Sequence, residues 1–466
     1  MERSNSKSPE VAIIKSQSPL ECVSNGLEKL GGISRYIQEG EQVFIKFNLS
    51  LPEGFPTTTN FDVLEVIIKS CIEVGVKKIF LGGYPMKGVT IKEISNAIGI
   101  ESYLATLRAE LAFLDNSNYF TKEKLPLEEL QKLKSNSFST IEVNEKEFKV
   151  PKVILESDKL ISVNQVNVNP LFTYNLSILN SYSIVPNKYQ KIEKVVQEGK
   201  DYFALDQYKQ DLISNILNVY SIKKPDIVIN DLYHVLECAG PCVYKDSKLK
   251  RTGFIVIGND AIAVDAVTLK LMNVEPLKHD LIMEARERGI GASDLSKIKI
   301  YGEKLKEHSI RVEECVKKLA DIEVQNVFIK QGQICSGCKE NAYHLLNTMK
   351  TKMIKDLKYL SSHSFLIGEN PLEPEGKQDN IILFGDCAIN TTEDRDFRKI
   401  VKKTKKKTKV KKNNKVLELG GCPPDLFSCI NKIIKHYKKK NIPSLNLYYK
   451  TIDHKIRNTL DKWEAL

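Results

Sequence analysis

The sequence lacks several features that would assign a chain to a familiar class. No apolar run in its 466 residues approaches the roughly 18 residues that a membrane-spanning helix needs. The first ten residues, MERSNSKSPE, are polar and have no apolar core of the kind found in signal peptides. No Ser-His-Asp, His-x-x-x-His or phosphate-loop pattern is evident, and no repeat of solenoid period occurs. We therefore expect a cytoplasmic protein without a membrane span.

Cysteine is too scarce for a secreted disulfide scaffold, because only 10 cysteines occur in 466 residues. In a reducing compartment, closely spaced cysteines more often bind metal or carry out redox chemistry. The hydrophobic content of 42% and the charged content of 28% are those of an ordinary globular protein. The cysteines are therefore the first candidates for function.

Acidic residues are missing from one stretch, and this explains most of the net charge of +11. Residues 398–415 read RKIVKKTKKKTKVKKNNK and hold eleven basic residues and no acidic ones. Such a run can bind nucleic acid or another polyanion. It contains no interleaved aromatic residues for base stacking, so we interpret it as a solvated loop and keep polyanion binding as the alternative.

Short apolar runs alternate with amphipathic stretches along the chain, which predicts an α/β fold with mainly parallel sheets. Helical spacing of apolar residues predicts a helix over Asp62–Val74. The clearest predicted strands are Val43–Phe47, Lys78–Leu81, Leu160–Val163, Asp226–Asn230 and Phe254–Ile257.

The organisation predicted from composition is two α/β domains. Residues 1–10 are expected to be a disordered tail, and residues 11–305 a first domain. A charged, helix-like connector follows at 306–320, in the helix-like sequence around Glu303–Leu319. A second, cysteine-rich domain is expected at 321–466, beginning with a strand near Asn326.

Three predicted strands of the second domain each lead into cysteine. They read NVFIKQGQICSGC, NIILFGDC and KVLELGGC, and they end at Cys335 and Cys338, at Cys387, and at Cys422. Ligands of α/β folds bind beyond the carboxyl ends of the strands, so four thiols from three strand ends can converge. A glycine near each arm would let backbone N–H groups approach the sulfurs; these are Gly337, Gly385 and Gly421.

Four cysteines suit either tetrahedral zinc or a [4Fe–4S] cluster. Zinc ribbons commonly use two Cys-x-x-Cys pairs, whereas one pair and two single cysteines occur here, which favours the cluster. The competing interpretation is that these are unrelated buried thiols, with Cys422 incidental to a Gly-Gly and Pro-Pro turn. Cys429 is expected to pack on a helix, and His344 to be structural.

The cysteine motifs resemble the small subunit of nickel–iron hydrogenases and the related cluster-bearing subunit of respiratory complex I. The similarity covers about residues 321–440 and lies in QICSGCKE, GDCA and GCPP. It implies a flavodoxin-like domain in which Cys335, Cys338, Cys387 and Cys422 hold a [4Fe–4S] cluster. After GDCA the hydrogenases usually have a Gly-Gly step, which is INTTED here, and no cysteine pairs suited to a nickel–iron centre occur. One-electron transfer with a redox partner protein or a small-molecule ligand is therefore implied, and hydrogenase activity is not.

The first 300 or so residues resemble the uncharacterised family of the domain of unknown function 362. Segments that carry the resemblance are VFIKFNL with the following TTT, SDKLI, ECAGP, NDAIAVDA and GIG. Many members of the family are described as iron–sulfur proteins, and the family is distantly similar to the nickel-pincer lactate racemases. The resemblance implies a ligand-binding α/β domain.

Five polar residues in these segments are candidate ligand-binding residues. Lys46 and Asn48 lie at the carboxyl end of a predicted strand, where they would suit an anionic group. Glu237 belongs to ECAGP, and Asp260 and Asp265 flank the buried-looking AIAV. In the alternative interpretation, Asp260 is only an N-cap and Asp265 is a satisfied core carboxylate.

One departure from the family pattern bears on the chemistry of the first domain. The usual Pro-Lys-x-Lys-x-His segment is NQVNVN at residues 164–169, and a later Lys-Asn pair is Leu179-Asn180. Asparagine and glutamine can form hydrogen bonds but supply neither charge nor a proton near neutral pH. We expect this domain to bind a different ligand or to be a structural partner of the cysteine-rich domain.

Overall fold

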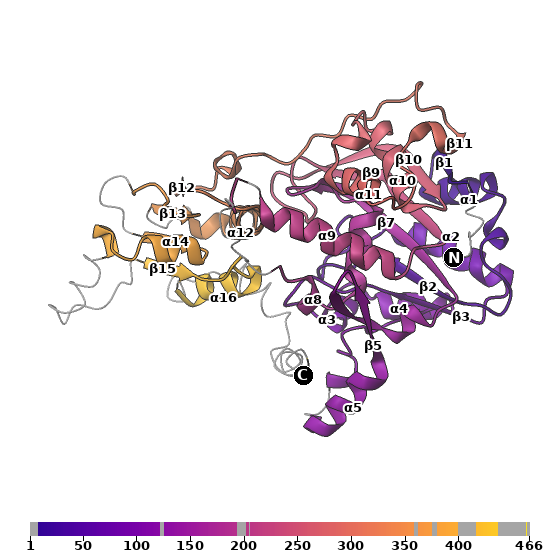
Figure 1. Cartoon of the computed structure of the whole chain (residues 1–466), viewed down its shortest axis with the longest axis horizontal. Coiled ribbons are helices and arrows are strands. Elements are labelled where there is room, and N and C mark those ends of the chain that lie inside the picture. Colours follow the sequence, from indigo (N-terminus) through magenta and orange to yellow (C-terminus); the bar gives the residue numbers. More distant parts are fainter. Residues whose placement is uncertain are drawn as a thin grey trace.

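The computed structural model describes residues 8–121, 125–192, 202–204, 206–357, 362–374, 380–398, 416–436 and Trp463. Two lobes are evident in Figure 1. The larger lobe is built around a nine-stranded sheet, and the smaller one around a four-stranded sheet. Helices α9 (Gln207–Ile222) and α12 (Ser336–Lys352) lie where the two lobes meet.

The large sheet is mixed but mainly parallel, as predicted. Its middle and one flank, β9-β7-β2-β3-β4, are parallel, whereas β10 runs antiparallel to both β9 and β1. The sheet order is β11 (Lys299–Gly302), β1 (Glu10–Lys15), β10 (Lys248–Gly258), β9 (Ile227–Glu237), β7 (Lys159–Asn169), β2 (Gln42–Phe47), β3 (Lys78–Gly82) and β4 (Glu110–Leu111), with β8 (Thr173–Tyr174) beside β7.

The helices of the large lobe cover the sheet with apolar faces. The predicted helix is confirmed as α2 (Phe61–Val74), which Asn60 caps by accepting the N–H of Asp62 at 3.0 Å and which ends at Gly75 in the left-handed conformation. The others are α1 (Pro19–Lys29), α3 (Ile91–Ile98), α4 (Ile100–Thr106), α5 (Leu127–Ser137), α6 (Lys152–Leu155), α7 (Ser177–Ser181), α8 (Asn187–Gln190), α10 (Ala261–Leu271) and α11 (Asp280–Glu287), with the hairpin β5 (Phe138–Val143) and β6 (Lys146–Pro151).

Strand β7 continues through the amide-rich run that departs from the family pattern, six residues past the predicted end at Val163. Asparagine disfavours strands because its side chain competes for backbone hydrogen bonds. Here those bonds stabilise the strand at an irregularity in its pairing with β9. The Asn167 amide donates to Pro56 O at 2.8 Å and accepts from Leu236 N at 2.8 Å.

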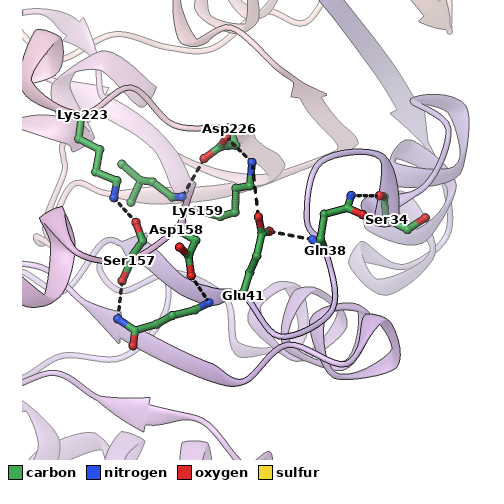
Figure 2. Close-up of polar contacts among 10 residues, drawn as sticks. Ser34, Gln38, Glu41, Ser157, Asp158, Lys159, Lys223 and Asp226 are labelled. Carbon is green, nitrogen blue, oxygen red and sulfur yellow. Dashed lines mark hydrogen bonds and ion pairs between the residues drawn. The ribbon is translucent and has the colours of Figure 1, made fainter.

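The amino ends of β2, β7 and β9 are joined by a polar network, shown in Figure 2. Lys159 Nζ lies 3.5 Å from Asp226 Oδ1, and Asp158 Oδ2 accepts the N–H of Gln42 at 2.8 Å. Lys223 Nζ donates to the carbonyls of Ile154, at 2.8 Å, and of Ser157. Ligands of parallel sheets bind at the opposite, carboxyl edge, so this network belongs to the scaffold and explains the SDKLI segment.

The small sheet is wholly parallel and runs in the order β12 (Val327–Gln331), β13 (His363–Ile367), β14 (Asn380–Phe384) and β15 (Val416–Leu419). Its helices are α12, α13 (Ile354–Leu357), α14 (Asp386–Thr391) and α16 (Leu426–His436). The four strands follow chain order, so the reversal of a flavodoxin-like sheet, 2-1-3-4-5, is not seen among the strands described.

The predicted helical connector is wrong, because residues 308–316 form neither helix nor strand. The backbone is bonded to the large lobe instead: Ile310 N donates to Leu271 O at 2.9 Å, and Glu313 O accepts from Cys238 N at 2.7 Å. Ile310 and Val312, which a helix would place on nearly opposite faces, are both buried. Contact with the large lobe thus replaces the hydrogen bonds that a helix would have made within itself.

Two further expectations concern the ends of the chain and the basic run. Glu10 is the first residue of β1 and is buried, so the tail ends before it, while residues 1–7 lie outside the described residues. Within the basic run only Arg398 is described, and it pairs with Glu418 at 2.6 Å. No helix in the described part of the chain has both the length and the apolar character that crossing a bilayer requires.

Candidate functional site

Cys335 and Cys338 lie where β12 leads into α12. Cys335 occupies the N-cap position of this helix and Cys338 its first turn, with exposures of only 6% and 5%. A hydrogen bond with the Cys338 thiol lowers the pKa of Cys335 to about 6, against the effect of burial, and the N–H groups of Cys338 and Gly337 contribute. The same hydrogen bond, together with burial, raises the pKa of Cys338. The hydrogen bond between the two thiols therefore favours the charged form at Cys335 and the protonated form at Cys338.

Cys387 and Cys422 lie at the ends of the two neighbouring strands. Cys387 is the second residue of α14, directly after β14, and Cys422 follows β15 and precedes a cis peptide bond to Pro423. Their loops are joined because Asp386 N donates to Gly421 O at 3.2 Å and Gly421 N donates to Asp386 Oδ1 at 2.7 Å. Both cysteines are half-buried.

The three cysteine loops meet at the carboxyl edge of the small sheet. The hydrogen bond with Cys335 and burial are the largest causes that raise the pKa of Cys338, and the charges of Cys335, Cys422 and Cys387 raise it further. A Cβ on Gly385 would lie 3.3 Å from Cys338 Sγ, so the β14 loop approaches this sulfur closely. Yet no three His, Cys, Asp or Glu side chains of the described residues stand in metal-binding geometry. The thiols are neighbours without being a preassembled ligand set.

His344 and Cys429 lie near these loops but have other surroundings. His344 Nδ1 is 2.7 Å from the Tyr244 hydroxyl, and burial lowers its pKa to about 4. Cys429 is buried on α16, and burial raises its pKa to about 12. A neutral histidine that bridges the lobes and a packed thiol agree with the structural roles expected for both.

Lys46 is buried and does not face solvent at the end of β2. Its Nζ donates to Phe47 O and to Asn180 Oδ1, both at 2.7 Å, and burial lowers its pKa to about 7. Asn48 joins strands, since it donates its N–H to Thr59 Oγ1 at 2.9 Å and accepts from Gln165 N at 2.7 Å. Both candidates thus have partners within the protein.

The three acidic candidates are also bonded internally. Asp260 caps α10 by accepting the N–H of Ala263 at 2.9 Å. Asp265 is fully buried, and burial raises its pKa to about 6, although Ser177, Ile178 and Asn230 all donate to its carboxylate at 2.6–3.0 Å.

Glu237 ends β9 and accepts the N–H of Glu313 at 3.1 Å. It therefore binds the 308–316 segment to the sheet. For Asp260 and Asp265 the geometry matches the N-cap and core-carboxylate interpretation.

No sequence pattern pointed to the polar residues of the large lobe that reach the cysteine loops. Asp206 accepts from the N–H of Ser336 at 3.2 Å, across 130 positions of the chain. Asp206 and Gln207 match no known sequence motif. The contact of Asp206 with Ser336 could therefore be found only from the way the two lobes pack.

Comparisons with known proteins give a distant fold likeness and one family match. No curated protein matches the chain. Among solved structures it is similar to the lactate racemase apoprotein from Thermoanaerobacterium thermosaccharolyticum, at 11% identity and a TM-score of 0.30, over 52% of this chain and 54% of that one. It is also similar to a structural-genomics target from Thermotoga maritima, at 12% identity and a TM-score of 0.28, over 78% and 75%.

The chain spans about half the length of the racemase it matches, and these likenesses concern the α/β fold alone. The cysteine-bearing lobe lies outside the family match. Residues 43–270 match the family described as domain of unknown function (DUF362), so this part of the chain is a DUF362 domain.

Proposed function

We propose that Cys335, Cys338, Cys387 and Cys422 bind a [4Fe–4S] cluster and that the protein transfers single electrons. The observation that carries the proposal is the meeting of three cysteine loops at one sheet edge, with all three other thiols acting on Cys338. Thiolate is the form of cysteine that ligates metal, and Cys335 has a lowered pKa. Four thiolates are the usual ligand set of such a cluster.

The residues around the thiols fit a group of this kind. Gly385 has a φ of 88°, and its missing side chain leaves room 3.3 Å from Cys338 Sγ. Gly421 has a φ of 133°, and a Cβ there would lie 2.8 Å from Pro424 Cα. Gly385 thus lets its loop pass close to the Cys338 sulfur, and Gly421 permits the tight turn into Pro423 and Pro424. Burial of Cys335 and Cys338 excludes water from one side. When bound, the cluster would supply one-electron reduction and oxidation.

The electron needs a second carrier, which we propose is a redox partner protein or a small redox-active molecule. Cys387 and Cys422 are the more exposed pair, so an exchange partner approaches from their side. The half-buried position of these thiols would also admit iron or zinc during assembly.

Anaerobic purification with iron, sulfide and zinc analysis tests the proposal, and electron paramagnetic resonance of the reduced protein identifies the cluster. We expect brown protein with about four irons per chain. Cys387→Ser should lose most of the iron, whereas the control Cys429→Ser, at a packed thiol, should keep it. Colourless protein with stoichiometric zinc would indicate a structural zinc site in place of the cluster. Protein that binds neither iron nor zinc would refute the proposal.

A further inference from the structure

Helix α12, which begins with the cysteine pair, receives its first hydrogen bonds from the large lobe. Asp206 stands at the N-cap position of α9 in the left-handed conformation, with φ 45° and ψ 50°, and makes no side-chain cap within α9. Its Oδ1 accepts the N–H of Ser336 at 3.2 Å, and its Oδ2 accepts the Ser336 hydroxyl. Ser336 is the first residue of α12 and directly follows Cys335. A carboxylate of one lobe thus holds the first turn of the other lobe's cysteine helix.

The same segment of the large lobe packs against the backbone between the two cysteines. A Cβ on Gly337 would lie 2.6 Å from Cζ of Tyr208, so the tyrosine ring contacts this loop directly. The ring therefore lies against the loop that carries both thiols.

We infer that the thiol site is completed by the large lobe: Tyr208 packs against the backbone between Cys335 and Cys338, and Asp206 is a positioning residue for this pair. The inference extends the proposed metal-binding function, and its relevance to metal binding rests on that proposal. It predicts that the cysteine pair is protected only while Asp206 holds the start of α12.

The physical basis is the unpaired donors of a helix start. The first N–H groups of an α-helix have no carbonyl partner within the helix, and that of Ser336 donates to Asp206 instead. A carboxylate placed there satisfies an N–H and complements the positive end of the helix dipole. Without it, the first turn frays and carries Cys335 and Cys338 into solvent.

Site-resolved alkylation of the metal-free full chain by iodoacetamide, followed by peptide mass spectrometry, tests the inference. In Asp206→Ala, we expect Cys335 and Cys338 to react about five-fold faster than in the wild type, as for loss of a helix cap. Asp206→Asn, which keeps an accepting oxygen, should restore much of the protection. Asp211→Asn is the matched control, because this carboxylate lies one turn further along α9 and accepts from Gln207.

Cys71 is the internal reference, since it is fully buried in the large lobe. A rate increase confined to Cys335 and Cys338 supports the inference. Unchanged rates in Asp206→Ala, or an increase no greater than that at Cys71, overturn it. Metal analysis of the wild type separates the two proposals: a chain that binds neither iron nor zinc ends the metal proposal, while the alkylation result still decides the role of Asp206.

Discussion

Replacing Lys46 by methionine should remove a pH dependence of stability that comes from burying an amine. Lys46 Nζ is enclosed with two oxygen acceptors, Phe47 O and Asn180 Oδ1, and with no carboxylate among its hydrogen-bond partners. Burial therefore lowers its pKa to about 7 from the ordinary value of 10.5. The unfolded chain keeps the ordinary value, so the two states bind protons differently between these limits.

The size and sign of the effect follow from that difference. Between about pH 7 and pH 10.5 the unfolded chain holds a proton on Lys46 that the folded chain lacks, so the free energy of unfolding rises with pH. The slope approaches 1.4 kcal/mol per pH unit, and the gain between about pH 7 and about pH 9 is about 2 kcal/mol. Below the folded pKa the full penalty of burying the charge is present, and it disappears above the unfolded pKa.

Urea unfolding gives the free energy of unfolding of the wild type and of Lys46→Met at both pH values. The difference in this free energy between the two proteins should change by about 2 kcal/mol between the two pH values. Other titrating groups cancel in that difference. Lys29→Met, at an exposed position of α1, is the control and should leave the difference unchanged with pH. If the wild type and Lys46→Met differ equally at both pH values, Lys46 keeps its proton in the folded state and the reasoning is refuted.

Three further predictions concern stability and the thiol loops. Asp260→Ala should lower the free energy of unfolding by about 1 kcal/mol through loss of the α10 cap, whereas Asp260→Asn should keep most of it in urea unfolding; equal losses would contradict the cap role. Gly385→Ala should lower the iron bound per chain, while Gly99→Ala, which shares the positive φ but has nothing within 4 Å, should not. Tyr244→Phe should destabilise by about 1–3 kcal/mol because it leaves a ring nitrogen of the buried His344 unpaired, and an unchanged urea midpoint would refute this.

Features that depend on local pattern could be predicted from the sequence. The run VFIKF is apolar except for Lys46 and forms β2, and the period of DVLEVIIKSCIEV gives α2 with its Asn60 cap and terminal glycine. The order of strand followed by cysteine, repeated three times, indicated that the thiols share one sheet edge. In each case neighbours in sequence supply the information.

Features that depend on partners far along the chain could not be predicted. Lys46 looks like an anion-binding residue at a strand end, but Asn180, 134 positions away, accepts from it inside the core. The charged segment after β11 has a helical pattern, yet its backbone bonds to Leu271 and Cys238. The same holds for Asn167 in β7, whose amide partners lie in other segments.

Helix α12 links the thiol site to the way the lobes are joined. Its first residue, Ser336, is held by Asp206. In its third turn, the Tyr343 hydroxyl accepts the N–H of Gly240 at 3.3 Å, and His344 contacts Tyr244. The helix that begins with the cysteine pair is thus bonded along its length to the large lobe. A ligand that bound all four thiols would tie α12 to β14 and β15 as well. Metal binding at the thiols should therefore also stabilise the contact between the lobes, and a loss of lobe contact should weaken metal binding by the same free energy, because the two equilibria are linked.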